Sequence, residues 1–531
     1  MQFSNLIPGL RKLDNKKSLL ILCIVLFLTF LDNTIVSVAL SSIQSSLSAG
    51  VQDMQWIVDG YMLVFAVFML SGGTLGDIIG RKKVLLSGII LFIAGSLMAF
   101  LARDTNLLIA GRVVMGIGAA ASEPGTLSII RHLYKDKKTL SSALGIWAAV
   151  SGIALAFGPI IGGIIVGFNS YRGIFMFNII LGVIALALGH FFLPESSDSK
   201  GRSFDITGLI LGGITVSSSI FGLIVGETAG YGSWWIALLF GISLLSLIGF
   251  IVNEGKVADP VLPLKYFKRL QFSFANIVAF SVNFGIFSVF FFVALYLQLI
   301  AGFSGYQIAL SFLTMTLAIV IASLVAGNLN GSHKTSLLMI GGTLLSGIGI
   351  FLIRTIISPK ISVLDLTWVL AISGFGFGIC LVTMTSSVLH IVPSKRSGMA
   401  ASVVNTSREL GGVFGVAILG SIVNGQLTSN LLIQLRKIGL PANFQSFAIY
   451  AITHGGNTPK GVSVSPSILI NHANLIAEVT KAAYQAFANG LNTALLIASA
   501  LLILTGLSYG LIYAIKHRSF NDRLLIVRGT K

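Results

Sequence analysis

Fourteen long apolar segments, separated by short polar stretches, limit this chain to the architecture of a polytopic membrane protein. Each segment has about the 20 apolar residues that an α-helix needs to cross a hydrocarbon core. The pattern therefore predicts an all-α protein with fourteen transmembrane helices. The segments lie near residues 18–42, 56–76, 84–102, 106–130, 140–166, 173–193, 206–226, 234–252, 272–300, 306–328, 336–357, 364–388, 400–424 and 485–515.

The composition agrees with this class. Of 531 residues, 55% are hydrophobic and 10% are charged, and the mean hydropathy is +0.92. A soluble domain has roughly 25% charged residues. Cys23 and Cys380 both fall in apolar segments and have no partner at the spacing of a disulfide or a metal site, so we interpret them as packing residues. We expect no metal and no cofactor.

The basic residues predict the orientation. Most of the 35 Lys and Arg residues lie in the N-terminal tail, the loops that follow even-numbered segments, and the C-terminal tail. Positive loops stay on the cytoplasmic side, so both termini are expected in the cytoplasm of a multi-pass cell-membrane protein. The basic residues behind the net charge of +17 lie between the apolar segments and are not gathered on one polar domain, which argues against a nucleic-acid partner. The first segment is too long for a signal peptide and is expected to be retained.

The chain repeats itself weakly. The stretch G73-T-L-G-D-I-I-G is echoed by G327-N-L-N-G, where Gly331 replaces the acid, and H132-L-Y-K-D-K-K resembles H390-I-V-P-S-K-R. Paired halves with a substrate site between them are typical of alternating-access transporters. We therefore expect a six-helix half over residues 1–193, a linker with two extra helices over 194–252, and a second six-helix half over 253–531. The second half includes an outer loop at about 425–484, expected to be partly helical.

A charged turn joins the second and third segments, within S71-G-G-T-L-G-D-I-I-G-R-K-K-V-L. Gly72, Gly76 and Gly80 recur every four residues and predict a smooth face for close helix contact. Asp77 is placed to meet the positive N-terminus of another helix or a basic residue of the opposite half. Alternatively, the turn only fixes topology through its three cations, although this leaves the ordered glycines unexplained.

The same stretch resembles the loop 2–3 signature of the major facilitator superfamily. Further stretches are similar to other motifs of its fourteen-span drug–proton antiporter branch, which includes EmrB- and QacA-like exporters. In the expected order these are L31-D-N-T-I-V-S-V-A-L, R112-V-V-M-G-I-G-A-A, G152-I-A-L-A-F-G-P-I-I-G-G, Y171-R-G-I-F-M-F-N, L295-Y-L-Q and S407-R-E-L-G-G-V-F-G. Two departures are Ser41, where a proline is usual, and the loss of both tryptophans from the pattern that begins at Tyr171.

The resemblance implies export of small molecules driven by inward proton flow. It assigns a switch role to Gly73, Gly76, Asp77, Gly80 and Arg81. It also makes Gly152, Gly158, Pro159, Gly162 and Gly163 an exporter motif in the fifth helix, where the proline should kink the helix and the glycines should allow close packing. The kink is either a static packing feature or a moving hinge.

Charges inside the predicted helices are the candidates for the mechanism, because each is costly at depth. Helix geometry places Asp32 and Arg112 at about the same depth in the membrane, so we expect them to form the proton-coupling pair. A change in their separation between two states would switch the protonation of Asp32.

Three further acidic residues and one arginine are weighed in the same way. Glu123 lies 11 residues after Arg112, on the same helix face, where relatives usually have an apolar residue. It is either a cavity carboxylate that suits a cationic substrate or a second proton, or a structural hydrogen-bonding residue. Glu409 is another proton-coupling candidate, Arg408 is a cavity candidate, and Asp59 is either in the cavity or at the outer interface.

The ninth segment is rich in phenylalanine. Asn276 and Asn283 are seven residues apart and share one face, which together with Gln298 makes them substrate-cavity candidates. Most of the phenylalanines are expected to face lipid.

Other functions find little support. There is no G-x-x-x-x-G-K-[ST] sequence for ATP binding, and no nucleophile has a recognisable base, so we expect a transporter rather than an enzyme. A channel or a transporter-like sensor is a less favoured alternative. The predicted partners are a small-molecule substrate, protons and the lipid bilayer, with a functional monomer. Substrates of any charge remain open, including drugs, antibiotics, siderophores, lipids and endogenous metabolites.

Overall fold

The computed structural model describes residues 8–47, 49, 51–168, 170–197, 205–258, 260, 262–303, 305–329, 334–358, 361–437 and 473–529. Over this part of the chain the fold is helical, without a β-strand. Fourteen of its helical segments are long and apolar enough to span a membrane, which confirms the fourteen predicted segments.

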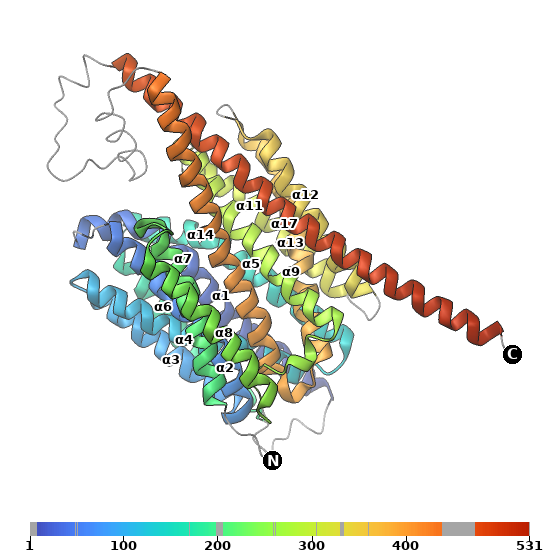
Figure 1. Ribbon diagram of the computed structural model, residues 1–531. Coiled ribbons are helices and arrows are strands. Elements are labelled where there is room, and N and C mark those ends of the chain that lie inside the picture. Colours follow the sequence, from blue (N-terminus) through green and yellow to red (C-terminus); the bar gives the residue numbers. More distant parts are fainter. Residues whose placement is uncertain are drawn as a thin grey trace.

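The helices run through the bundle in the order shown in Figure 1. Their boundaries are within a few residues of the predicted ones in most cases. The helices are α1 (Pro8–Leu47), α2 (Val51–Ile79), α3 (Arg81–Leu101), α4 (Thr105–Leu133), α5 (Lys137–Phe168), α6 (Arg172–Phe192), α7 (Ile206–Ala229), α8 (Trp234–Lys256), α9 (Leu270–Ser288), α10 (Ala294–Leu299), α11 (Gly305–Leu329), α12 (Lys334–Ile356), α13 (Val363–Ile391), α14 (Ser397–Lys437) and α17 (Ala473–Gly529).

The first six helices and the last six pack in the same pattern. In the N-terminal half, α4 packs on α2 and α3, and α1 packs on α5; in the C-terminal half, α13 packs on α11 and α12, and α9 packs on α14. The weak sequence repeat therefore reflects a structural repeat. The span that begins with α9 continues through a π-helical turn at Val289–Val293 into α10. Cys23 and Cys380 are buried free cysteines within the helix packing.

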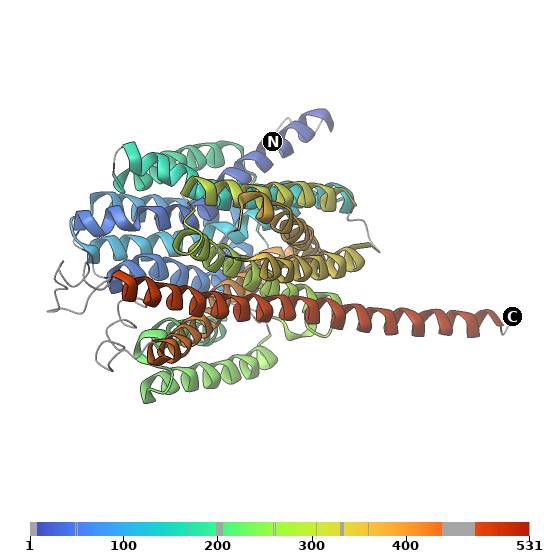
Figure 2. The same cartoon turned by 90° about the horizontal axis from the view of Figure 1, so that it is seen from above.

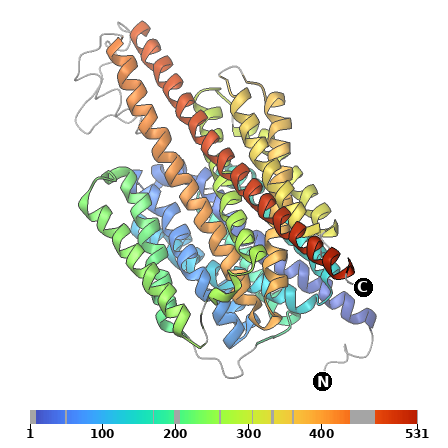
Figure 3. The ribbon, with the colours of Figure 1, turned by 45° about the vertical axis from the view of Figure 1, so that its right-hand side comes forward.

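The extra pair, α7 and α8, is attached to the side of the bundle. The two helices pack on each other, and α7 also contacts α2 and α14. Much of the surface of α8 is apolar and exposed, including Leu244 and Leu245. This surface suits contact with lipid chains, and Figure 3 shows the pair at the edge of the bundle.

The two halves meet mainly through α2 with α14 and α5 with α11. These contacts are equivalent under the repeat, because each joins the second helix of one half to the fifth helix of the other. Several of them lie near the loops α2–α3, α4–α5 and α13–α14. We call the end formed by residues 80, 134–136 and 392–396 the closed end.

Two helices are longer than predicted. α14 has 41 residues and α17 has 57, and their adjoining parts pack together through residues such as Leu431 and Leu435. Helix thus extends to residue 437 and resumes at residue 473, so both margins of the predicted outer loop are helical, and its centre lies outside the described residues. Figures 1 and 2 show α17 extending past the rest of the bundle at its C-terminal end.

Candidate functional site

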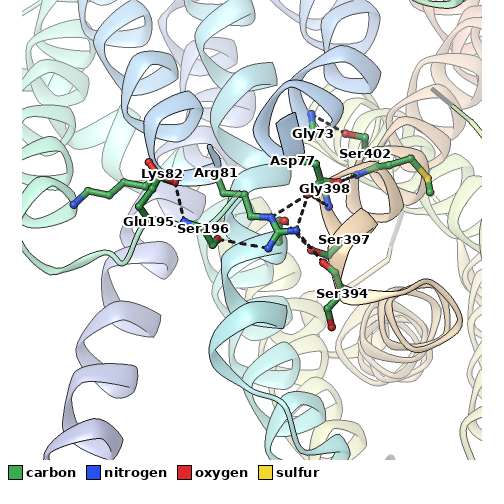
Figure 4. Close-up of polar contacts among 12 residues, drawn as sticks. Gly73, Asp77, Arg81, Lys82, Glu195, Ser196, Ser394, Ser397, Gly398 and Ser402 are labelled. Carbon is green, nitrogen blue, oxygen red and sulfur yellow. Dashed lines mark hydrogen bonds and ion pairs between the residues drawn. The ribbon is translucent and has the colours of Figure 1, made fainter. Parts of the chain in front are cut away.

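Asp77 lies at the N-terminus of α14, where the two halves meet at the closed end. Its carboxylate accepts hydrogen bonds from the backbone N–H groups of Gly398 and Met399, both at 3.0 Å. The first N–H groups of a helix have no partner within the helix and carry partial positive charge. Asp77 therefore binds the opposite half through a helix terminus, while its basic partner, Arg81, comes from its own half (Figure 4).

Arg81 extends the same network. Its guanidinium donates to Asp77 Oδ1 through Nε at 3.0 Å and Nη2 at 2.8 Å, and Nη2 also donates to the Ser394 carbonyl at 2.9 Å. Arg81 and Asp77 are both buried. Beside them, Glu195 accepts a hydrogen bond from the backbone N–H of Lys82 at 3.1 Å, at the start of α3 (Figure 4). We call Asp77, Arg81, Ser394, Gly398 and Met399 the latch.

The glycines of α2 have different roles. Gly73 packs directly against the backbone of Gly398, and its N–H donates to Ser402 Oγ at 3.0 Å. Gly72 packs against the backbone of Ala120 in its own half. Gly80 has a φ of 132°, a backbone conformation that favours glycine, and it ends α2. Gly76 has room for a Cβ, so the predicted smooth stripe is wrong at this position.

The repeat-related contact between α5 and α11 also depends on glycine. A Cβ on Gly145 would lie 2.8 Å from the Ser323 carbonyl, and one on Gly327 would lie 2.8 Å from the Ser141 carbonyl. Next to them, Ser142 Oγ donates to Asn328 Oδ1 at 2.9 Å. The partner glycine of the echo, Gly331, lies outside the described residues.

The residues of the predicted exporter motif in α5 lie in different environments. Gly158 packs against Thr34 of α1, and a Cβ on Gly152 would lie 2.8 Å from Ile319 of α11. Gly162 is buried, whereas Gly163 faces open space, so close packing is wrong for Gly163. The backbone at Pro159 is helical, and its side chain lies outside the described part.

Asp32 and Arg112 form a buried ion pair between α1 and α4. Arg112 Nη1 contacts Asp32 Oδ2, and Arg112 Nε donates to the Ile57 carbonyl of α2 at 2.9 Å. Asn178 of α6 donates to the other carboxylate oxygen at 2.7 Å. The guanidinium also lies over the ring of Tyr61, 4.3 Å from its centre. One carboxylate thus joins three helices in a site without solvent exposure, where unpaired charge is costly.

Glu123 and Arg408 bring the two halves together nearer the centre of the bundle. Arg408 Nη1 lies 3.9 Å from Glu123 Oε1, and it donates to Asn405 Oδ1 of its own helix at 3.3 Å. Both side chains are buried, and neither oxygen of Glu123 accepts a hydrogen bond within the described structure. The guanidinium lies over the rings of Phe30 and Trp147, at 5.1 and 5.6 Å.

Among the remaining candidates, Glu409 lies close enough to Glu123 and Arg408 for their charges to interact. Glu409 is buried and Asp59 is half-buried. Asn276 bridges α9 to α14, since its Oδ1 accepts from Ser407 at 3.1 Å, whereas the amide of Asn283 donates to the Ala279 carbonyl of its own helix at 3.0 Å. The side chain of Gln298 lies outside the described part. Within that part, no cluster of His, Cys, Asp and Glu side chains has the arrangement of a metal site.

Sequence reasoning missed the residues that hold these charges in place. Asn178 stands at the end of the stretch that begins at Tyr171, but no spacing in the sequence connects it to Asp32. Tyr61, Phe30 and Trp147 lie in apolar segments where an aromatic residue is ordinary. Only the rarity of polar residues in such segments singles out Asn178.

A family model of the Major Facilitator Superfamily matches residues 22–416. The chain belongs to the major facilitator superfamily. Its fold is that of this superfamily, and a solved structure of the proton:xylose symporter XylE is similar over 94% of this chain and 95% of that chain, with a TM-score of 0.58 and 14% identity. At that identity the similarity concerns the fold alone.

Similar proteins are named for drug or antibiotic resistance. The methylenomycin A resistance protein of Bacillus subtilis is 30% identical over 76% of this chain and 87% of its own length. The multidrug resistance protein Stp of Mycobacterium tuberculosis is 29% identical over 90% of this chain and 88% of its own length. This superfamily member is accordingly a multi-pass membrane transporter of small molecules.

Proposed function

We propose that this protein is a proton-coupled antiporter that exports small lipophilic compounds from the cell by alternating access. The buried Asp32–Arg112 pair carries the proposal, because it places a protonatable group against a fixed positive charge between helices of the transport bundle. The relatives named for resistance support efflux of drugs or antibiotics as the task.

The pair can bind and release one proton. In the described state, the Asp32 carboxylate is held by the Arg112 guanidinium and by the Asn178 amide. A proton on Oδ2 neutralises the carboxylate and breaks the ion pair. Arg112 then keeps its bond to the Ile57 carbonyl and its contact with Tyr61, so the guanidinium is not left without partners. Protonation therefore changes the contact between α1 and α4 at limited cost.

We take the closed end to be the cytoplasmic end, as the basic loops predict. The described state is then closed toward the cytoplasm. To accept a substrate from inside, the protein must separate the latch and the contact between α5 and α11. Both contacts combine glycine surfaces with a small number of hydrogen bonds, which suits an interface that opens and closes repeatedly.

A transport assay on reconstituted protein tests the proposal. The protein in liposomes is given an imposed pH gradient, and uptake or release of a panel of lipophilic antibiotics of different charge is measured. Asp32→Asn should abolish accumulation against a gradient, since an amide cannot carry the proton. Asp104→Asn is the matched control, because Asp104 caps α4 at an exposed position and accepts from Leu107 N–H at 2.9 Å.

The outcomes separate the possibilities clearly. Gradient-driven accumulation that survives Asp32→Asn would show that the proton is carried elsewhere, with Glu123 or Glu409 as the next candidates. Transport that requires ATP and is insensitive to a protonophore would refute the proposal as a whole.

A further inference from the structure

Three residues of the N-terminal half form an open-sided cage near the middle of the bundle. Phe30 of α1 and Trp147 of α5 pack edge to face, with ring centres 6.4 Å apart. Glu123 of α4 provides the carboxylate. Thr126 holds the cage together, because it accepts a hydrogen bond from Trp147 Nε1 at 3.0 Å and donates to the Glu123 carbonyl at 2.6 Å. We call Phe30, Glu123 and Trp147 the cage.

The cage lies at mid-membrane depth. Glu123 is 10 residues from the closed end of α4, and Arg408 is 11 residues from the closed end of α14. At 1.5 Å per residue, both side chains start at about 15–16 Å from that end, which is half of a core of about 30 Å. A transporter of this architecture binds its substrate at this depth, between the halves.

Arg408 occupies the cage from the opposite half. Its guanidinium lies over both rings and near the carboxylate, so it makes the contacts that a bound organic cation would make. This contact joins the two halves through oppositely charged groups within 4.0 Å of each other.

The fit between arginine and cage is nevertheless poor. A good arginine–carboxylate pair has two hydrogen bonds of about 2.7–2.9 Å. Here the nearest atoms are 3.9 Å apart, and both Glu123 oxygens and Arg408 Nε are buried without a hydrogen-bond partner in the described structure. The Glu123 carboxylate accepts no hydrogen bond in the described structure and lies near two aromatic faces. Such a site suits a cation without N–H or O–H donors, such as a quaternary ammonium or phosphonium group.

We propose that the cage is a receptor for the cationic group of a transported compound, and that Arg408 is its built-in occupant, which the compound displaces. That the bound compound is transported rests on the proposed export function. The binding event itself requires no proton gradient. It deepens that function by naming the residue with which a cationic compound competes.

Space and charge repulsion make the two occupants compete. The Arg408 guanidinium lies over both rings and 3.9 Å from Glu123 Oε1, so a second cation cannot make the same contacts while Arg408 is there. Like charges also repel each other in a water-poor site, and the nearby Glu409 carboxylate offsets part of that repulsion. Since Arg408 belongs to the C-terminal half, a cation that enters the cage removes a contact between the halves at the centre of the membrane. Binding of the compound thereby favours separation of the halves at this depth.

Equilibrium binding of tetraphenylphosphonium to purified protein in detergent tests the proposal. Glu123→Gln should weaken binding at least about tenfold, because it removes the countercharge. Arg408→Gln should have the opposite effect and tighten binding at least about tenfold, because it removes the competitor. Neutral triphenylphosphine oxide is the matched control probe, and its binding should change little in either variant.

The sign of the Arg408 effect decides the matter. If folded Arg408→Gln protein binds tetraphenylphosphonium equally or more weakly, Arg408 is a structural or substrate-binding group and not an occupant. If Glu123→Gln leaves binding unchanged, the cage is not the receptor. Should Arg408→Gln fail to give monodisperse protein, Arg408→Met replaces it, since methionine is flexible and uncharged, and this variant should also tighten binding.

The Asp32→Asn variant distinguishes a defect at the proton site from a defect in the cage in the same experiment. This variant should bind tetraphenylphosphonium normally even where it no longer drives export. Normal binding without export would therefore concern the proposed coupling alone, while lost binding in Glu123→Gln concerns the cage.

Discussion

Replacing Asp77 by asparagine should weaken the closed end without unfolding the protein. The substitution keeps the size of the side chain and one acceptor oxygen, but it removes the charge. In the structure this carboxylate accepts two backbone N–H groups of α14 and two N–H groups of Arg81, at distances of 2.8–3.0 Å. The asparagine Nδ2 would have to face one of these donor pairs.

The magnitude follows from these contacts. Hydrogen bonds to a charged group contribute roughly 1.5–3 kcal/mol each, and the amide loses the equivalent of one or two of them. We therefore expect the closed arrangement to lose about 2–4 kcal/mol relative to the open one, which is roughly a 30- to 1,000-fold change in their ratio. This loss of free energy changes the equilibrium between the closed and open arrangements, because the partners Gly398 and Met399 belong to the other half.

Electron spin resonance between labels on the two halves measures this shift. Lys83→Cys and Lys268→Cys place labels on exposed residues near the closed end, one in each half, while the natural cysteines are buried. Asp77→Asn should lengthen and broaden the distance distribution, and export should fall while the amount of protein in the membrane is maintained.

A carboxylate at the same end provides the control. Asp136 caps α5, accepting from the backbone N–H of Thr139 at 3.0 Å, and its recorded partners are all in its own loop and helix. Asp136→Asn should leave the distance distribution unchanged. If Asp77→Asn also leaves it unchanged, the latch does not stabilise the closed arrangement, and the charged turn acts only in fixing topology.

Two further predictions concern close packing and titration. Gly145→Ala should impair export because its Cβ would meet the Ser323 carbonyl across the contact between the halves. Gly163 faces open space, so Gly163→Ala should export normally. Equal export by the two variants would show that close packing of α5 on α11 is not needed for transport. The backbone N–H of Thr139 holds the pKa of Asp136 below its usual value, so the cap stabilises the start of α5 at neutral pH and is lost as the pH falls through that lowered value. Nuclear magnetic resonance titration of Asp136 should therefore give a midpoint below that of an unstructured aspartate, and an ordinary midpoint would contradict the cap.

The fold was largely predictable because the membrane restricts the choices. Backbone polar groups must be satisfied inside the hydrocarbon core, so long apolar segments have to be helices, and counting them gave the correct number. The helical margins of the outer loop at about 425–484 were harder to predict. The ends of α14 and α17 near Lys437 and Ala473 are too polar to be recognised as membrane helices. These ends pack on each other, and such packing depends on contacts distant in sequence.

Parts of the candidate site were predictable for a similar reason. Charges are rare in apolar segments, so the sequence alone singles out Asp32, Arg112, Glu123 and Arg408. The sequence did not indicate that Arg408 lies against Glu123, because the two residues are 285 positions apart and belong to different halves. Aromatic side chains such as Phe30 and Trp147 gave no signal, since their role depends on the cation that the fold brings to them.

The continuous length of α14 has a mechanical consequence. Its 41 residues make a rod of about 60 Å, held at the closed end by Asp77 and carrying Arg408 about a quarter of the way along. With the latch as the fulcrum of this lever, each degree of tilt moves the far end by about 1 Å and the Arg408 position by about a quarter of that. A small shift of Arg408 caused by a bound cation would thus become a larger displacement where α14 packs on α17.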